Sequence, residues 1–112
     1  MNLTSRTLGP VELVTLAGSI EGNEGQSLRL GLSERIEAGR TRMLLDMESV
    51  DFIDSTGLSA LIGALKATRR TGGNIGLLNP APTVRSVLEL TRLHRVLDIF
   101  STEAEGVEKL AS

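Results

Sequence analysis

Apolar residues recur along this chain with two different spacings, which predict strands and helices in turn. Short runs rich in leucine, isoleucine and valine predict β-strands over residues 3–8, 11–17, 42–47, 75–78 and 96–100, with a separate extended link over residues 50–53. Apolar residues three and four positions apart predict helices between these strands. The apolar positions of the first two helices are Leu28, Leu32 and Ile36, and then Leu58, Leu61, Ile62 and Leu65. We expect the latter four to be core residues and not part of an interface.

Glycine, proline and capping residues predict where the helices begin and end. Three glycines within residues 18–25 predict a loop before the first helix, and Gly39 is expected to end that helix. The second helix is predicted over Gly57–Thr71, and the third follows the Asn79–Pro82 segment. A capping box of Thr102 and Glu105 predicts the start of the last helix, because both side chains can bind free backbone amides there.

The order of these elements predicts a single α/β domain over residues 1–112. The first two strands are joined by a turn at Gly9-Pro10 and should pair as an antiparallel hairpin. The later connections contain helices and are long enough for parallel pairing. We therefore expect a small mixed sheet of four to five strands with helices packed against it.

The composition narrows the possible partners. Only 2% of the residues are aromatic, which removes the stacking surfaces that single-stranded nucleic acids use. The net charge of −2 gives no attraction to nucleic acids or to anionic membranes. The sequence has no cysteine and no apolar run long enough to span a bilayer. We expect a cytoplasmic domain with neither a nucleic acid nor a membrane as a direct partner.

Residues for catalysis or metal binding do not form a pattern. His94 is the only histidine and has no cysteine to pair with, and no nucleophile elbow is present. The glycine-rich stretches lack the lysine of a phosphate-binding loop. The four carboxylates Asp46, Glu48, Asp51 and Asp54 are close in sequence but do not have the spacing of a calcium loop. We therefore expect no enzyme activity, no metal and no cofactor.

The segment Asp54-Ser55-Thr56-Gly57 stands where the second helix should begin. Asp, Ser and Thr at such a position usually cap a helix, because their side chains accept a hydrogen bond from a free amide. A hydroxyl at a helix start is also well placed to carry a phosphate, since the free amides and the helix dipole favour the added charge. By residue chemistry alone both interpretations stay open.

The sequence around this segment resembles a known family. The residues L-L-D-M-E-S-V-D-F-I-D-S-T-G-L-S-A-L, followed by R-R-T-G-G-N-I-G-L-L-N, are similar to the STAS domain of bacterial anti-sigma factor antagonists. The supporting pattern runs from V-T-L-A-G-S-I-E to L-H-R-V-L-D-I-F-S-T-E-A-E. The resemblance implies a small α/β domain that acts by binding in partner switching, as in sporulation and stress responses.

The resemblance also implies a phosphorylation site. In that family the serine after the second aspartate of the motif is phosphorylated by a partner that is both anti-sigma factor and serine-protein kinase. That position is Ser55 here, with Thr56 as the alternative. The unphosphorylated form binds the kinase and so frees a sigma factor. The phosphorylated form dissociates from the kinase, and a metal-dependent serine phosphatase then removes the phosphate. ATP and magnesium belong to the kinase, so no cofactor is implied for this chain.

The resemblance places the partner contacts around Ser55. The candidate contact residues are Glu21, Asp51, Asp54, Thr56, Gly57 and Ser59. Gly57 is expected to allow close approach of the kinase, and amides at the helix start are expected to hold the phosphate. The same domain type can instead be a non-catalytic subunit of a larger signalling scaffold or lipid-transport complex. A monomer or a weak dimer is compatible with the sequence.

Overall fold

The computed structural model describes residues 2–112 and contains one five-stranded sheet in the order β1-β2-β3-β4-β5. The strands are β1 (Asn2–Leu8), β2 (Val11–Ile20), β3 (Arg42–Ile53), β4 (Asn74–Leu78) and β5 (Asp98–Phe100). The pair β1 and β2 is antiparallel, and the three later pairs are parallel. The predicted mixed sheet and its opening hairpin are therefore confirmed.

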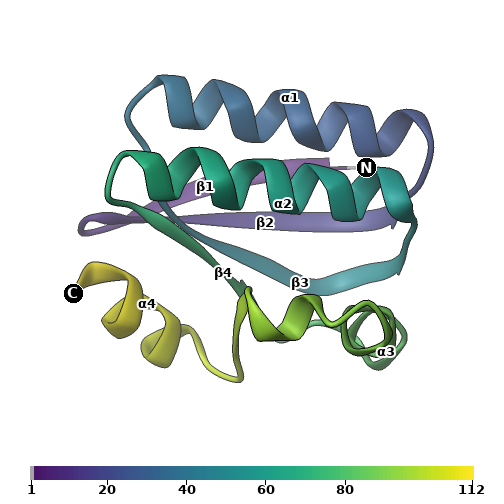
Figure 1. Cartoon of the computed structure of the whole chain (residues 1–112). Helices are drawn as coiled ribbons and strands as arrows, with labels where there is room; N and C mark the ends of the chain where they lie inside the picture. The colour runs from purple at the N-terminus through teal and green to yellow at the C-terminus, as the bar shows by residue number, and fades with distance from the viewer. Residues whose placement is uncertain (1) are drawn as a thin grey trace.

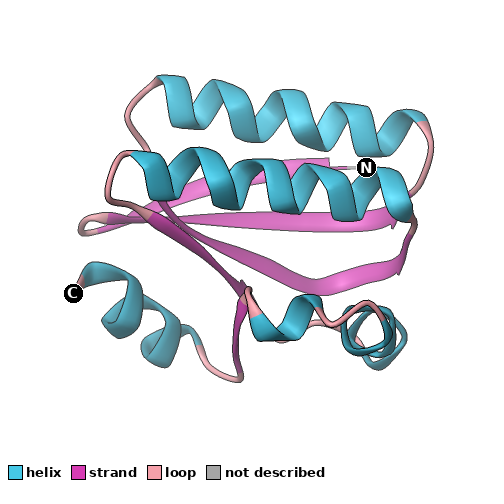
Figure 2. Ribbon diagram, viewed as in Figure 1, coloured by secondary structure: helices cyan, strands magenta, loops and turns pink. Residues whose placement is uncertain are grey.

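Four α-helices and one short 3-10 helix connect and cover the strands. They are α1 (Asn23–Glu37), α2 (Ser55–Arg70), α3 (Pro82–Leu90), η1 (Leu93–Arg95) and α4 (Glu103–Ala111). Helices α1 and α2 lie side by side over one face of the sheet (Figure 1), and α3 and α4 lie below it in the same view (Figure 2). The predicted order of elements is confirmed.

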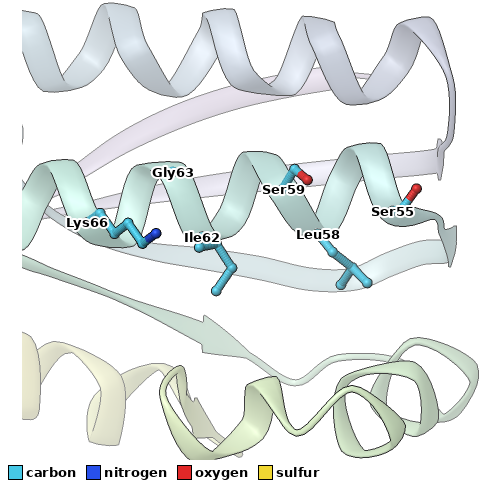
Figure 3. Close-up of a pocket in the computed structure, with 6 residues that line it drawn as sticks. All are labelled: Ser55, Leu58, Ser59, Ile62, Gly63 and Lys66. Atoms are coloured by element: carbon cyan, nitrogen blue, oxygen red, sulfur yellow. The ribbon is translucent and has the colours of Figure 1, made fainter.

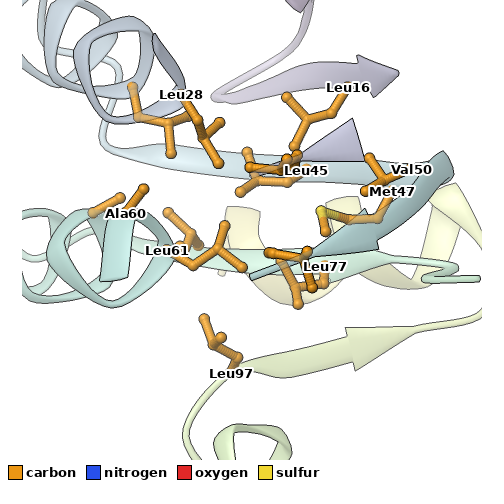
Figure 4. Packing of buried hydrophobic residues seen from close by; sticks show 14 of the residues in the cluster. Leu16, Leu28, Leu45, Met47, Val50, Ala60, Leu61, Leu77 and Leu97 are labelled. Atoms are coloured by element: carbon orange, nitrogen blue, oxygen red, sulfur yellow. The ribbon is translucent and has the colours of Figure 1, made fainter. Parts of the chain in front are cut away.

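The packing of these layers creates two apolar cores. The larger core joins the sheet to α1, α2 and α3, and Leu28, Leu61 and Leu77 are completely buried in it (Figure 4). The smaller core lies on the other face, where Leu110 of α4 packs against Leu44. Burial of this kind contributes roughly 1.5–3 kcal/mol for each large apolar side chain. Both cores fix the sheet that carries the candidate site.

The predicted loop over residues 18–25 is wrong, because β2 continues to Ile20 and α1 already begins at Asn23. The strand tolerates Gly18 because the pairing of β2 with β3 is irregular there, and Gly18 has a φ of 102° that favours glycine. The connection between β2 and α1 consists only of Glu21 and Gly22. Such a short connection places the start of α1 directly at the end of β2.

The predicted break in the middle strand is also wrong, because β3 runs without interruption from Arg42 to Ile53. Register shifts absorb extra residues of β3 opposite β2. As a result, the sequence separation of paired residues grows from 31 residues for Glu12 and Met43 to 33 residues for Ile20 and Ile53. A strand can continue through such bulges while the ladder is only locally disturbed.

The helices differ from their predicted limits at a few places. Helix α2 begins at Ser55, two residues before the predicted start. The predicted strand over residues 96–100 is shortened to β5, because Val96 follows η1 and its amide donates to the carbonyl oxygen of Leu93. Leu61 and Leu65 are buried as expected, but Leu58 and Ile62 are only half-buried. The latter two residues were therefore wrongly assigned entirely to the core.

Candidate functional site

The candidate site lies where the parallel strands β2 and β3 end together. Ile20 is paired with Ile53 at the last position of both strands, and the amide of Asp54 donates a 3.0 Å hydrogen bond to the carbonyl oxygen of Ile20. Functional sites of α/β sheets usually lie at this carboxyl edge, because the following loops and helix starts converge there. The short connection before α1 thus meets the start of α2.

Asp54 caps α2. Its backbone is extended, and its Oδ1 accepts hydrogen bonds from the amides of Thr56 at 2.9 Å and Gly57 at 3.2 Å. The expected capping role of the segment is confirmed, and the residue that carries it is the aspartate. The expectation that amides at the helix start hold a phosphate is wrong for these two amides, because Asp54 already occupies both.

The second oxygen of the same carboxylate binds the start of α1. Its Oδ2 accepts a 3.0 Å hydrogen bond from the amide of Gly22, which directly precedes α1. A hydrogen bond from the Thr56 hydroxyl and, after it, the bond from the Gly22 amide lower the pKa of Asp54 below its usual value of 3.8. Asp54 is therefore ionised at neutral pH and joins the starts of both helices.

The hydroxyl of Thr56 is engaged within the domain. It donates to Asp54 Oδ1 and lies 3.3 Å from the carbonyl oxygen of Gly22. Gly25 of α1 packs against it so tightly that a Cβ atom at residue 25 would lie 2.1 Å from Thr56 Oγ1. The Thr56 hydroxyl thus stabilises the junction of α1 and α2.

The hydroxyl of Ser55 has the opposite environment. Ser55 is the first residue of α2 and is exposed, and its side chain has no hydrogen-bond partner within residues 2–112. Figure 3 shows its hydroxyl at the start of α2, at one end of a row of side chains. The two adjacent hydroxyls therefore differ in availability, which the sequence could not show.

Of the other predicted contact residues near Ser55, one is not accessible to a partner. Glu21 and Asp51 are exposed, and Asp51 accepts a 2.7 Å hydrogen bond from the Ser19 hydroxyl. Gly57, in contrast, is buried, and a Cβ atom there would lie 2.6 Å from Ile53 Cγ1. The expectation that Gly57 lets a partner approach is wrong, because its missing side chain makes room for Ile53 of the core.

A hollow on the outer face of α2 begins at Ser55. It is open, has a volume of about 420 Å³ and is lined by Ser55, Leu58, Ser59, Ile62, Gly63 and Lys66 (Figure 3). The predicted contact residue Ser59 lies within it. Sequence reasoning missed Gly63 and Lys66, although a glycine in the interior of a predicted helix was a usable signal.

The other residues considered for catalysis or metal binding are His94 and the carboxylates. His94 is in η1, where its Nδ1 is 3.4 Å from the carbonyl oxygen of Leu88. Across residues 2–112, no three carboxylate or imidazole side chains are grouped so that they could hold a metal ion. In the same range, no helix is both long and apolar enough to cross a membrane.

Comparison with protein families identifies the kind of domain that carries this site. A model of the STAS domain matches residues 2–106, nearly the whole chain. The chain belongs to the STAS domain family. The resemblance noted from the sequence is thereby confirmed, and the site described above lies entirely within the matched part of this STAS domain.

Known proteins similar to this STAS domain include anti-sigma factor antagonists. It is 24% identical to an anti-sigma F factor antagonist of Paenibacillus polymyxa, over 89% of this chain and 86% of the relative. It is 28% identical to the anti-sigma-B factor antagonist of Bacillus subtilis, over 85% of this chain and 86% of the relative.

Solved structures confirm the fold. The anti-sigma factor antagonist SpoIIAA in its unphosphorylated form superposes with a TM-score of 0.75, at 22% identity and with 99% of each chain covered. The Bacillus cell fate determinant SpoIIAA in its phosphorylated form gives a TM-score of 0.73, at 24% identity, over 96% of this chain and 98% of that one. Similarity at this level of identity concerns the fold alone.

Proposed function

We propose that this STAS domain is an anti-sigma factor antagonist that is switched off by phosphorylation of Ser55. The observation that carries the proposal is the contrast between two adjacent hydroxyls at the start of α2. Ser55 is exposed and without a partner among the described residues, whereas Thr56 is bound to Asp54 and packed against Gly25. The names of the similar proteins from Paenibacillus polymyxa and Bacillus subtilis support an anti-sigma factor as the partner.

In the unphosphorylated state, the domain binds an anti-sigma factor that is also a serine-protein kinase and so frees a sigma factor. Contacts are made by the exposed residues around Ser55, which include Glu21, Asp51 and Ser59. The kinase brings ATP and magnesium, and the STAS domain supplies only the acceptor hydroxyl. A metal-dependent serine phosphatase restores the binding form.

Phosphorylation acts by excluding the partner. A phosphate adds a charge of about −1.5 to −2 to a surface that already carries the ionised Asp54 and the exposed Asp51. Burying this charge against a partner without matched cations costs several kcal/mol. A loss of ~3–4 kcal/mol weakens binding by a few hundred-fold. The fold itself is retained, because no described residue depends on the Ser55 hydroxyl for a hydrogen bond.

The test is to incubate the domain with the kinase and ATP and to locate the phosphate by mass spectrometry. We expect one phosphate, on Ser55, and none on a Ser55→Ala variant. A Thr56→Val variant is the matched control and should still be phosphorylated. Phosphate on Thr56 would contradict the assignment of the acceptor. The absence of any phosphate would favour the other candidate, a non-catalytic subunit of a larger signalling or lipid-transport assembly.

A further inference from the structure

We propose that the hollow on α2 receives an apolar side chain of the anti-sigma factor, and that Gly63 is the residue that admits it. This inference rests on the proposed function, since it assigns a docking surface for the same partner. The hollow is formed by one face of α2 between Ser55 and Lys66 (Figure 3). Four features of this face support the proposal.

The first feature is that Gly63 has no structural reason within the domain to be glycine. The other helical glycines of residues 2–112 each touch a neighbour, and an added Cβ atom would lie 2.1 Å from the nearest atom at Gly25, 2.5 Å at Gly31, 2.6 Å at Gly57 and 2.7 Å at Gly106. At Gly63 an added Cβ atom meets nothing within 4 Å among the described residues. Glycine in a helix interior is unfavourable relative to alanine. The open space over Gly63 therefore points to a molecule that approaches from outside.

The second feature is the apolar wall of the hollow. Leu58 and Ile62 are four residues apart, and their side chains lie on the same side of α2 in Figure 3. Both pack against the larger core and remain partly exposed. Partly exposed apolar residues beside a depression gain stability when a partner side chain covers them. An apolar occupant thus matches the wall.

The third feature is the difference in charge between the two ends. The ionised Asp54 stands next to Ser55 at one end, and the exposed Lys66 stands at the other, without an ion pair in the described part of the chain. Lys66 lies eleven positions after Ser55 in α2, a rise of ~16 Å. A partner segment with an apolar side chain in the middle and a carboxylate toward Lys66 matches this distribution. The charges would fix its direction along α2.

The fourth feature is continuity with the acceptor. Ser55 itself lines the hollow, so a molecule seated there would lie next to the proposed acceptor residue. A phosphate on Ser55 would then stand at the edge of an apolar contact, where water can no longer solvate it fully. The hollow therefore couples partner binding to the phosphorylation state of the domain.

The experiment measures stability and binding for the same substitution. Gly63→Ala should raise the melting temperature by roughly 2–8 °C, because alanine favours the helix. The same variant should bind the purified anti-sigma factor roughly tenfold more weakly in calorimetric titrations, and Gly63→Leu, whose larger side chain projects into the hollow, more weakly still. The control is Leu30→Gln on α1, where Leu30 is 58% exposed and outside the hollow. It should bind like the wild type.

The outcomes separate this inference from the proposed function. If Gly63→Ala is stabilised and binds as tightly as the wild type, the inference is wrong and the antagonist function stands. If the wild-type domain does not bind the anti-sigma factor, both this inference and the proposed antagonist function are wrong. If the wild type forms a dimer in sedimentation experiments that Gly63→Leu abolishes, the hollow belongs to a second copy of this chain, and the inference is again wrong.

Discussion

The carboxylate of Asp54 accepts a hydrogen bond of 3.0 Å from the amide of Gly22, a residue 32 positions earlier in the chain. Since the other carboxylate oxygen caps α2, one side chain joins the starts of α1 and α2. The proposed acceptor Ser55 therefore follows a residue that is hydrogen-bonded to the starts of both helices. This arrangement suits a residue that has to be recognised by another protein in a constant position.

Replacing Asp54 with alanine should destabilise the domain. The substitution removes the cap of α2 and leaves the amide of Gly22 without its acceptor. We expect the melting temperature to fall by roughly 5 °C or more in a thermal denaturation experiment. Asp51→Ala is a suitable control, because within residues 2–112 the Asp51 side chain binds only the Ser19 hydroxyl, so its loss should lower the melting temperature much less. Equal losses for both variants would contradict the special role of Asp54.

The stability of the domain should depend on pH through Asp54. Because hydrogen bonds from Thr56 and Gly22 lower the pKa of Asp54 in the folded state, its contribution is fully present above the unfolded value of about 3.8. It is lost as the pH falls through the lower pKa of the folded state. Denaturation of the wild type and of Asp54→Asn between pH 2 and pH 7 should show this difference. The stability gap between the two should be constant above pH 5 and narrow in acid.

Substituting alanine for Gly25 should have the opposite effect from the same change at Gly63. A Cβ atom at residue 25 would lie 2.1 Å from Thr56 Oγ1, so α1 or α2 must shift. Overpacking of this kind costs typically about 1–3 kcal/mol, and more where the backbone is also close. Chemical denaturation should thus give a lower free energy of unfolding for Gly25→Ala and a higher one for Gly63→Ala. The same sign for both would mean that the packing at Thr56 is less tight than described.

Charge at residue 55 should abolish partner binding without unfolding the domain. Ser55→Asp is expected to keep the circular dichroism spectrum of the wild type, because the Ser55 side chain has no hydrogen-bond partner in residues 2–112. In a pull-down assay it should no longer retain the kinase, whereas Ser55→Ala should. Aspartate carries less charge than phosphoserine, so this variant sets a lower limit for the effect. Tight binding by Ser55→Asp would contradict the exclusion of the partner by charge.

Local sequence patterns were sufficient to predict the order of the elements but not their connections. The spacing of Leu61 and Leu65 identifies the buried face of α2, and the strands of the sheet follow from their apolar runs. The continuation of β2 through Gly18 depends on pairing with β3, which no local pattern contains. The same holds for the site, because the difference between Ser55 and Thr56 arises from Gly22 and Gly25 of another segment.

The bulges between β2 and β3 determine how far Asp54 and the proposed phosphorylation site extend past the end of β2. Had the pairing of Glu12 with Met43 continued without them, Ile20 would stand opposite Asp51, and Asp54 would extend two residues farther past the end of β2. Its carboxylate would then be about 6–7 Å from its present position along the strand and out of reach of the Gly22 amide. A change that straightens β3 without removing its two extra residues would therefore separate Asp54 from α1, although it alters neither Asp54 nor Gly22.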